Sequence, residues 1–254
     1  MIGSLEIEKG CAYWTIDTGC VNAFGANEVR EMRELFELCC SKFPNEIRVL
    51  CIKSHKISPS GKPIFCAGAN LKERSDWSEE HLLQHLMFQR QTLHMLRTMP
   101  VFTYLYVDGY AIGLGVEMCL ACDFVVSTPN GRFALPEVSL GIIPGAGGYT
   151  WAKHWARYPK EAMDWVNGGE TIDSKYAQWL GVIDARVGYE PLESRHQNLF
   201  HWIDGMSAEE QWMLKEKRWF SCEFDVWFKE EQRIYAEKIL AGGGLGKIHL
   251  KRNS

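Results

Sequence analysis

Strand-like and helix-like segments alternate through the first two thirds of this sequence, and that alternation limits the possible folds more than any other feature. Residues 5–17 alternate apolar and polar side chains around a turn at Lys9 and Gly10, which predicts a β-hairpin. Further strands are expected over residues 48–53, 101–107 and 123–127. This order of elements predicts a layered α/β domain built from βαβ units with right-handed crossovers.

Amphipathic segments between these strands predict helices. Asn27 is expected to cap a helix that ends at Pro44, and Ser78 to cap a second helix that runs to about residue 98. The glycines of residues 109–115 are expected to open a third helix. In the first helix, the apolar positions that fall at helical spacing are Val29, Met32, Leu35, Phe36 and Cys39.

Beyond Pro144 the pattern changes to one helix after another. Thr171 precedes an expected helix over residues 172–180, with Gly181 just after its end. Ser207 and Glu210 have the spacing of a capping box, which predicts the start of another helix. The last third of the chain is therefore expected to be helical.

The 254 residues are enough for one large α/β domain, and 46% hydrophobic with 24% charged residues argues against disorder. Because no Pro/Gly/Ser-rich linker precedes the helical part, we expect residues 1–190 to form an α/β core that holds the site. Residues 191–254 are expected to form a helical region packed on this core or on a neighbouring subunit. Core or subunit-interface packing is expected for Trp151, Trp155, Trp165 and Trp179.

Charge and hydropathy exclude several classes of partner. The 28 basic and 32 acidic residues give a net charge of −4, so nothing global favours a nucleic acid or an anionic membrane. No apolar run approaches the roughly 20 residues of a membrane-spanning helix. The first ten residues resemble neither a secretory signal nor an organellar presequence, so a cytoplasmic location is expected.

The nine cysteines lack the spacing of a metal site. Cys119 and Cys122 form the single CxxC pair, with no second pair and no histidine at the distance typical of zinc ligands. We therefore expect free, mostly buried thiols and no metal.

Three segments have the composition of ligand-binding backbone. Residues 65–71 carry small side chains after a strand, so a ligand can approach the main chain there. Residues 109–117 place glycines where a strand gives way to a helix, which leaves free N–H groups at the helix start. Residues 136–148 form a third glycine-rich stretch. The acidic residues Glu117 and Glu137 fall within the second and third segments.

Read in order, FCAGANLKE, GYAIGLGVEMCLACD and LPEVSLGIIPGAGG resemble the enoyl-CoA hydratase/isomerase (crotonase) superfamily, over about residues 5–187. The stretch CAGANLKERSDWS is most similar to the methylglutaconyl-CoA hydratase-like branch, whose substrate carries an extra carboxylate that Arg74 could meet. The resemblance implies a crotonase-like ββα superhelix core with a C-terminal helical trimerisation region. It also implies a homotrimer or hexamer.

The same resemblance implies a site and a reaction. The backbone N–H groups of Ala69 and Leu114 would hold an enolate oxygen, and Glu117 with Glu137 would transfer protons as water adds across the 2,3 double bond of an enoyl thioester. No cofactor is implied beyond the coenzyme A of the substrate. The resemblance places substrate or coenzyme A contacts at Cys66, Ala67, Gly68, Ala69, Lys72, Gly113, Pro136 and Gly145.

The chain departs from the family pattern at several positions. Leu114 replaces a common glycine, Asn70 replaces an aspartate, and residues 19–21, directly before Asn22, include no Lys or Arg. A weakened coenzyme A site would suit a substrate attached to an acyl-carrier protein. The basic residues that could still supply phosphate contacts are Lys62, Lys72, Arg74, Lys247, Lys251 and Arg252.

Two other functions are also compatible with these motifs. One is isomerisation or decarboxylation of an acyl thioester by a member of the same superfamily, although retention of both glutamates favours a hydratase. The other is a non-catalytic scaffold or RNA-binding homologue, which the net charge of −4 disfavours.

Overall fold

The computed structural model describes residues 2–188, 203, 205–219 and 224–242, and its architecture is mixed α/β, as predicted. A six-stranded sheet has the order β1-β2-β4-β8-β10-β13. Only β1 and β2 pair antiparallel, while the other neighbours are parallel. Its strands are β1 (Gly3–Glu8), β2 (Cys11–Ile16), β4 (Val49–Ser54), β8 (Phe102–Val107), β10 (Phe124–Ser127) and β13 (Ala185–Arg186).

Two smaller sheets carry the segments that form the site. One has five strands in the order β12-β11-β9-β6-β5, and the other pairs β3 with β7. Their strands are β3 (Ala23–Phe24), β5 (Lys56–Ile57), β6 (Pro63–Cys66), β7 (Gly68–Ala69), β9 (Tyr110–Ile112), β11 (Arg132–Ala134) and β12 (Ile172–Asp173).

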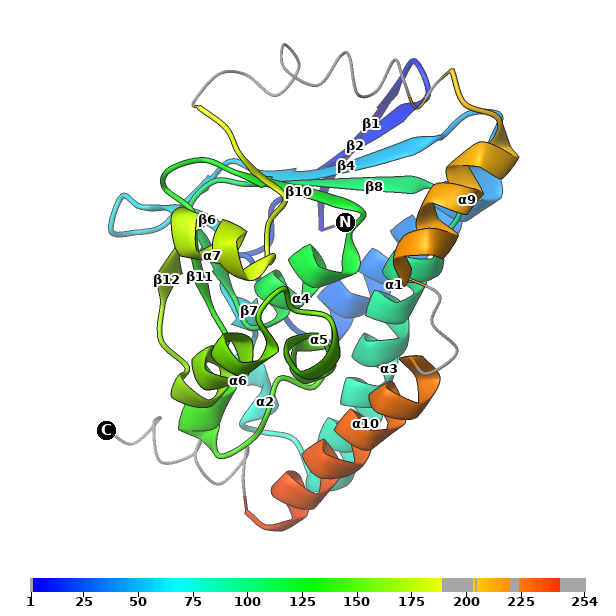
Figure 1. The fold of residues 1–254 in the computed structure, drawn as a ribbon. Coiled ribbons are helices and arrows are strands. Elements are labelled where there is room, and N and C mark those ends of the chain that lie inside the picture. Colours follow the sequence, from blue (N-terminus) through cyan, green and yellow to red (C-terminus); the bar gives the residue numbers. More distant parts are fainter. Residues whose placement is uncertain (1, 189–202, 204, 220–223, 243–254) are drawn as a thin grey trace.

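Helices connect the parallel strands and lie against the large sheet (Figure 1). The chain passes through α1 between β2 and β4, α3 between β4 and β8, and α4 between β8 and β10. The described helices are α1 (Ala26–Lys42), α2 (Leu71–Arg74), α3 (Glu79–Thr98), α4 (Leu114–Ala121), the 3₁₀ helix η1 (Pro136–Leu140), α5 (Gly148–His154), α6 (Pro159–Gly168), α7 (Ser174–Leu180), α9 (Ala208–Trp219) and α10 (Phe224–Leu240).

The core lies between the large sheet and the helices that pack on it. All five apolar positions predicted for the first helix are buried in α1. Trp14 of β2 meets Phe36 of α1 edge to face, with ring centroids 6.0 Å apart. Trp151 and Trp165 are buried in the core, as expected, whereas Trp179 is 37% exposed and stacks on Tyr158.

Two predicted helix starts were wrong by a few residues. Gly25, not Asn27, caps α1, and the side chain of Glu28 accepts a hydrogen bond from the N–H of Gly25. Asp173, not Thr171, caps α7 and accepts a hydrogen bond from the N–H of Tyr176. The region around Ile172 pairs with β11 before the helix begins, which delays the helix by two residues.

The helix predicted to open within residues 109–115 is confirmed, and it begins near the end of that range. Tyr110–Ile112 forms β9, and α4 begins only at Leu114. Gly113 joins the two elements with a φ of 53°, a left-handed conformation that a glycine adopts without steric cost.

The C-terminal helices pack on α3. Helix α9 lies beside α3, and α10 contacts both α3 and α5, along one side of the molecule in Figure 1. The predicted capping box at the start of α9 is confirmed, since Ser207 and Glu210 exchange hydrogen bonds between side chain and backbone. The proposed division at residue 190 falls outside the described residues and stays a prediction.

Eight of the nine cysteines lie in the described part, and all eight are free thiols, as predicted. Six of them are buried, Cys40 is half-buried and Cys20 is exposed. Within that part of the chain, no three His, Cys, Asp or Glu side chains are grouped so that they could hold a metal ion.

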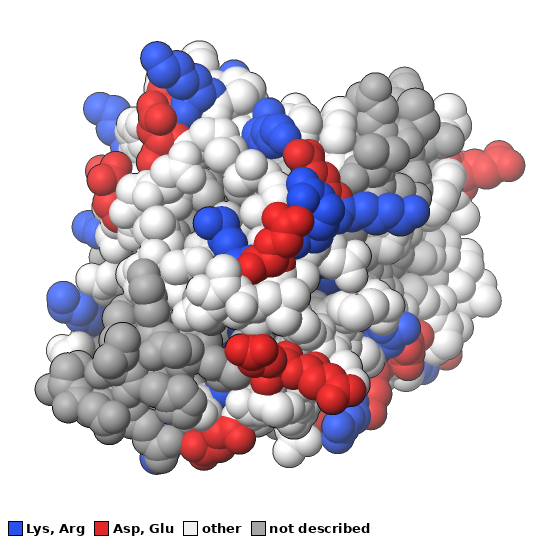
Figure 2. All heavy atoms as spheres, turned by 90° about the horizontal axis from the view of Figure 1, so that it is seen from below, with Lys and Arg blue, Asp and Glu red and all other residues white. Residues whose placement is uncertain are grey.

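On the face of the molecule seen in Figure 2, basic and acidic side chains lie beside one another. Among the helices that the structure describes, none is both long and apolar enough to cross a bilayer.

Candidate active site

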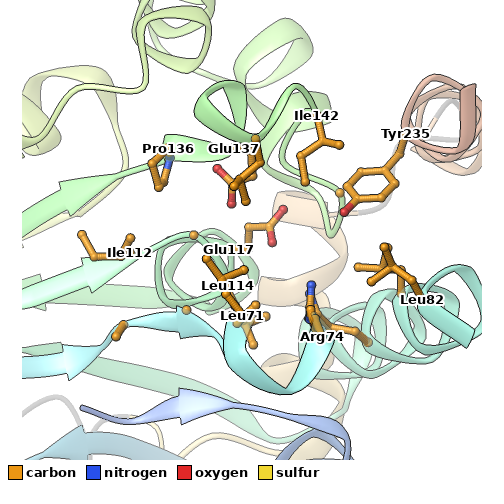
Figure 3. Close-up of a pocket in the computed structure, with 18 residues that line it drawn as sticks. Leu71, Arg74, Leu82, Ile112, Leu114, Glu117, Pro136, Glu137, Ile142 and Tyr235 are labelled. Atoms are coloured by element: carbon orange, nitrogen blue, oxygen red, sulfur yellow. The ribbon is translucent and has the colours of Figure 1, made fainter. Parts of the chain in front are cut away.

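A cavity of about 150 Å³ opens where the short strand β7, the start of α4, η1 and α10 meet (Figure 3). Its wall is mostly apolar, with two carboxylates and one guanidinium among the lining side chains. The lining residues are Ala67, Gly68, Ala69, Leu71, Arg74, Leu82, Leu86, Gln89, Ile112, Gly113, Leu114, Glu117, Pro136, Glu137, Leu140, Ile142, Gly145 and Tyr235.

Close contact between two backbone segments builds one side of this cavity. Gly68 has a φ of 88°, and a Cβ at this position would lie 2.8 Å from the carbonyl oxygen of Ile112 and 3.7 Å from the amide nitrogen of Leu114. A larger residue at Gly68 would therefore collide with the end of β9. The absence of a side chain lets Ala69 and Leu114 lie beside one another.

Two backbone N–H groups of this region are not needed by the secondary structure. The N–H of Asn70 donates to the carbonyl of Phe24, and successive amides of a strand point to opposite sides, so the N–H of Ala69 points away from β3. Leu114 is the first residue of α4, where an N–H has no partner within the helix. Both residues line the cavity.

Glu117 lies in the first turn of α4 and is 3% exposed. Its Oε1 accepts hydrogen bonds from the N–H of Ala146 at 2.7 Å and of Gly148 at 3.2 Å. Burial, together with the nearby Glu231, raises the pKa of Glu117 to about 7, although the two amide bonds lower it. This carboxyl group is therefore poised to gain or lose a proton near neutral pH.

Glu137 lies in the first turn of η1 and points into the same cavity (Figure 3). The residue as a whole is half-buried, but its Oε2 is covered and has no hydrogen-bond partner. Burial, and next the charge of Glu117, raise the pKa of Glu137 to about 8. Such an oxygen is open to a bond with a ligand or a water molecule.

A buried arginine faces the two carboxylates from the opposite wall. Arg74, at the end of α2, donates from Nη2 to Oε1 of Gln89 at 2.6 Å and lies 3.3 Å from Nε2 of His85. Burial, and next the charge of Arg74, lower the pKa of His85 to about 3, so this ring is neutral. The Nε of Arg74 is buried without a hydrogen-bond partner.

Nine of the eleven predicted site residues line the cavity. Cys66 is fully buried behind it, so close to Gly115 that a Cβ on that glycine would lie 2.9 Å from the Cβ of Cys66. Lys72 is exposed on α2 and outside the lining. Lys62 is exposed too, with its ammonium group 5.8 Å from the ring centroid of Tyr110. The C-terminal candidates Lys247, Lys251 and Arg252 lie outside the described residues.

Three residues that support Glu117 were not among the site residues predicted from the sequence. Arg90 of α3 donates from Nε to the carbonyl of Gly145 at 2.7 Å, and Glu231 of α10 accepts from the N–H groups of Gly147 and Thr150. Tyr235 packs so tightly on Gly145 that a Cβ there would lie 2.4 Å from its ring. The one sequence feature that could have pointed to these residues is the position of Arg90 on the buried face of a predicted helix.

Comparisons with known proteins agree with this architecture. The enoyl-CoA hydratase/isomerase family model matches residues 6–226. Among curated relatives, enoyl-CoA isomerase/hydratase fer4 of Mycosarcoma maydis is 39% identical over 123 residues, which are 48% of this chain and 44% of that protein. A Bacillus subtilis protein named as an enoyl-CoA hydratase/isomerase, YngF, is 29% identical over 168 residues, or 64% of this chain and 60% of that one. The matches thus span less than two thirds of either relative.

Solved structures show the same fold. An enoyl-CoA hydratase from Bacillus halodurans has a TM-score of 0.85 at 19% identity, covering 98% of this chain and 100% of that one. The enoyl-CoA hydratase of Bacillus anthracis has a TM-score of 0.77 at 21% identity, covering 95% and 92% of the two chains. With the family model matched over most of its length, this chain belongs to the enoyl-CoA hydratase/isomerase family and has the crotonase fold.

Proposed function

We propose that this protein adds water to, or removes it from, the 2,3 double bond of an enoyl-CoA. The observation that carries the proposal is the meeting of Glu117 and Glu137 in one cavity with the backbone N–H groups of Ala69 and Leu114. The two carboxyl groups have raised pKa values. This combination supplies the donors and the proton carriers that hydration requires.

The two amides account for activation of the thioester. When water attacks C3, negative charge moves through C2 to the thioester oxygen, and an enolate forms. Donors held in place before the reaction stabilise this charge without reorganising, and one such donor contributes about 2.7–4 kcal/mol. We assign this role to the N–H groups of Ala69 and Leu114.

The two glutamates account for the proton transfers. The oxygen of water bonds to C3 while its proton passes to one carboxylate, and C2 receives a proton from the other carboxyl group. Glu117 has the lower of the two pKa values and is assigned as the base, and Glu137 is assigned as the acid. Proton exchange between the two groups and solvent restores the starting state.

The competing reaction moves the double bond from the 3,4 to the 2,3 position, as a proton leaves C2 and a proton is added at C4. It adds no water and needs only one carboxylate to carry the proton. The names of both curated relatives include isomerase as well as hydratase. Incubation with crotonyl-CoA and with a 3-enoyl-CoA separates the two reactions. A 3-hydroxyacyl product, one water heavier than crotonyl-CoA, is expected; conversion of the 3-enoyl substrate without any hydroxyacyl product would establish the isomerase instead.

The substrate's acyl group is proposed to carry a carboxylate at its far end. Arg74 is 5% exposed and lines the cavity, and its Nε has no hydrogen-bond partner. No described carboxylate lies within ion-pair distance of it, although the charges of Glu117, Glu73 and Glu137 act on it from further away. A buried guanidinium with an N–H group that makes no hydrogen bond is costly, and an anionic acyl group would satisfy that N–H group. This supports the methylglutaconyl-CoA-like class of substrate over a plain fatty acyl chain.

Replacing Arg74 by methionine should therefore remove the preference for an acidic acyl group. We expect kcat/KM for a 2-enoyl-CoA with a terminal carboxylate to fall about 100-fold relative to the same chain with a terminal methyl, the scale of a lost buried charge contact. The ratio is the readout because Arg74 also acts on Glu137. Lys72→Met, on the same helix but exposed, should leave the ratio unchanged; an equal change in both variants would contradict a specific contact.

The choice between coenzyme A and an acyl-carrier protein stays a prediction. So do the homotrimer or hexamer and the cytoplasmic location.

A further inference from the structure

Helix α10 presents one buried face to the site, and that face lies beyond the region that the family model matches. Glu231, Tyr235 and Ile239 recur at intervals of four residues and are 0%, 4% and 1% exposed. The family match ends at residue 226. Tyr235 lines the cavity, and Figure 3 shows its hydroxyl pointing into the same space as Glu117. Glu231 lies one helical turn earlier and reaches the loop behind Glu117.

The loop that precedes α5 is shared between two carboxylates. Glu117 accepts hydrogen bonds from the amides of Ala146 and Gly148. Glu231 accepts from two other amides of the same segment: its Oε1 from Gly147 at 2.8 Å and its Oε2 from Thr150 at 2.7 Å. Glu231 thus holds two amides of this segment, and Glu117 holds two others.

Arg90 completes the arrangement from α3. Its guanidinium bonds to the carbonyl of Gly145 and lies 3.7 Å from Oε1 of Glu231. The loop is therefore held by a carbonyl bond at one end and by the two oxygens of Glu231 further along. Both of these bonds of Glu117 go to Oε1, so this loop does not engage Oε2. We therefore assign Oε2 as the atom that takes the proton from the attacking water.

We infer that Glu231 is a positioning residue for Glu117, which holds the loop before α5 so that Oε2 of Glu117 is directed at the substrate. This inference rests on the proposed function for the role of Glu117. It makes α10 a required part of the site, and not only a helix that covers the core.

The charge of Glu231 also acts on Glu117. The groups that face Glu117 from the surrounding elements are Glu231 and Tyr235 of α10, Arg90 and Arg97 of α3, Arg74 of α2 and Glu137 of η1. Glu231 raises the pKa of Glu117, whereas Arg90 lowers it. Loss of the negative charge at Glu231 leaves Arg90 uncompensated, so the pKa of Glu117 should fall.

Glu231→Gln tests the inference. Glutamine retains one acceptor but turns an NH₂ group toward a backbone N–H, so one of the two loop bonds is lost. We expect kcat to fall by up to about 100-fold with little change in KM, the scale of a misplaced catalytic group. The acidic limb of the pH profile should move to lower pH. Glu230→Gln is the matched control, because Glu230 also joins α10 to α5, through an ion pair with Lys153 at 3.0 Å, without touching the loop.

Three further measurements separate positioning from a loss of folding and from failure of the proposed function. Glu231→Asp keeps the charge and should leave the pH limb in place even if kcat falls. In the Glu117→Gln background, Glu231→Gln should cost little further activity. Titration of ¹³C-labelled glutamate carboxyls by NMR reports the pKa of Glu117 without turnover, so it decides the matter even if the wild type hydrates no enoyl thioester. An unchanged Glu117 titration, or additive losses in the double variant, would overturn the inference.

Discussion

Replacing Glu137 by glutamine should lower kcat for hydration by about 10²- to 10⁴-fold, the usual contribution of a general acid or base. Glutamine fills the same space but cannot give a proton to C2. Glu117→Gln should lose a similar factor, since its amide oxygen can still accept from Ala146 and Gly148 while the base is gone. The measurement is the initial rate of 3-hydroxyacyl-CoA formation from crotonyl-CoA.

The pH dependence of kcat/KM tests which glutamate is the base and which is the acid. In the wild type, kcat/KM should fall below about pH 7, as Glu117 gains a proton, and again above about pH 8, as Glu137 loses one. The limbs belong to the interacting pair and report its two apparent pKa values. Residual activity of Glu137→Gln should therefore lack the alkaline limb. A full bell-shaped profile in this variant would contradict the assignment of Glu137 as the acid.

Stability provides the control for folding. The folded-state pKa of Glu137 is raised, so its contribution to the free energy of unfolding is complete at acidic pH and is lost as pH rises toward about 8. Glu137→Gln carries no such loss and should unfold at a higher temperature than the wild type at pH 9. Glu161→Gln replaces another first-turn glutamate, which lies outside the cavity, and should change neither rate nor stability. Equal rates in all three proteins would reject the mechanism.

The fold was predictable wherever burial and periodicity coincide in one segment. The spacing of Val29, Met32 and Phe36 alone locates the buried face of α1, because a long amphipathic helix carries its own signal. By contrast, β9 has only three residues, and its pairing with β6 and β11 comes from segments far apart in the chain. The glycines of residues 109–117 indicate the change from strand to helix, but no local pattern shows that residues 110–112 pair as a separate strand before α4 begins.

The parts of the site that carry a local sequence motif could also be predicted. The loop before β7, the start of α4 and η1 each combine a backbone conformation with characteristic residues, so their motifs identify them. Glu231 has no motif around it, and it meets Gly147 from 84 residues away. Arg90 and Tyr235 likewise act through tertiary packing, which no spacing in the sequence encodes. Side chains that support a catalytic group are therefore found only when the structure brings their helices together.

Leu114→Pro should lower kcat by about 10²- to 10³-fold, the cost of losing one oxyanion donor. Ordinary substitutions leave a backbone N–H in place, but proline removes it. Leu114 is the first residue of α4, where proline is well accepted because the missing N–H has no partner within the helix. The preceding Gly113 has the conformational freedom to keep its left-handed φ. KM should rise by a far smaller factor than kcat falls, because charge reaches the thioester oxygen mainly in the transition state.

Leu114→Ala is the matched control, because it removes the same buried side chain and keeps the N–H. Both variants should lose stability by about 2–5 kcal/mol from the cavity that is left, so thermal unfolding of the two should be similar. Their rates should differ, since only the alanine variant can still bind the enolate oxygen at this position. If the proline variant hydrated crotonyl-CoA as fast as the alanine variant, the N–H of Leu114 would not contact the developing charge. Another donor of the cavity wall would then have to bind the enolate oxygen.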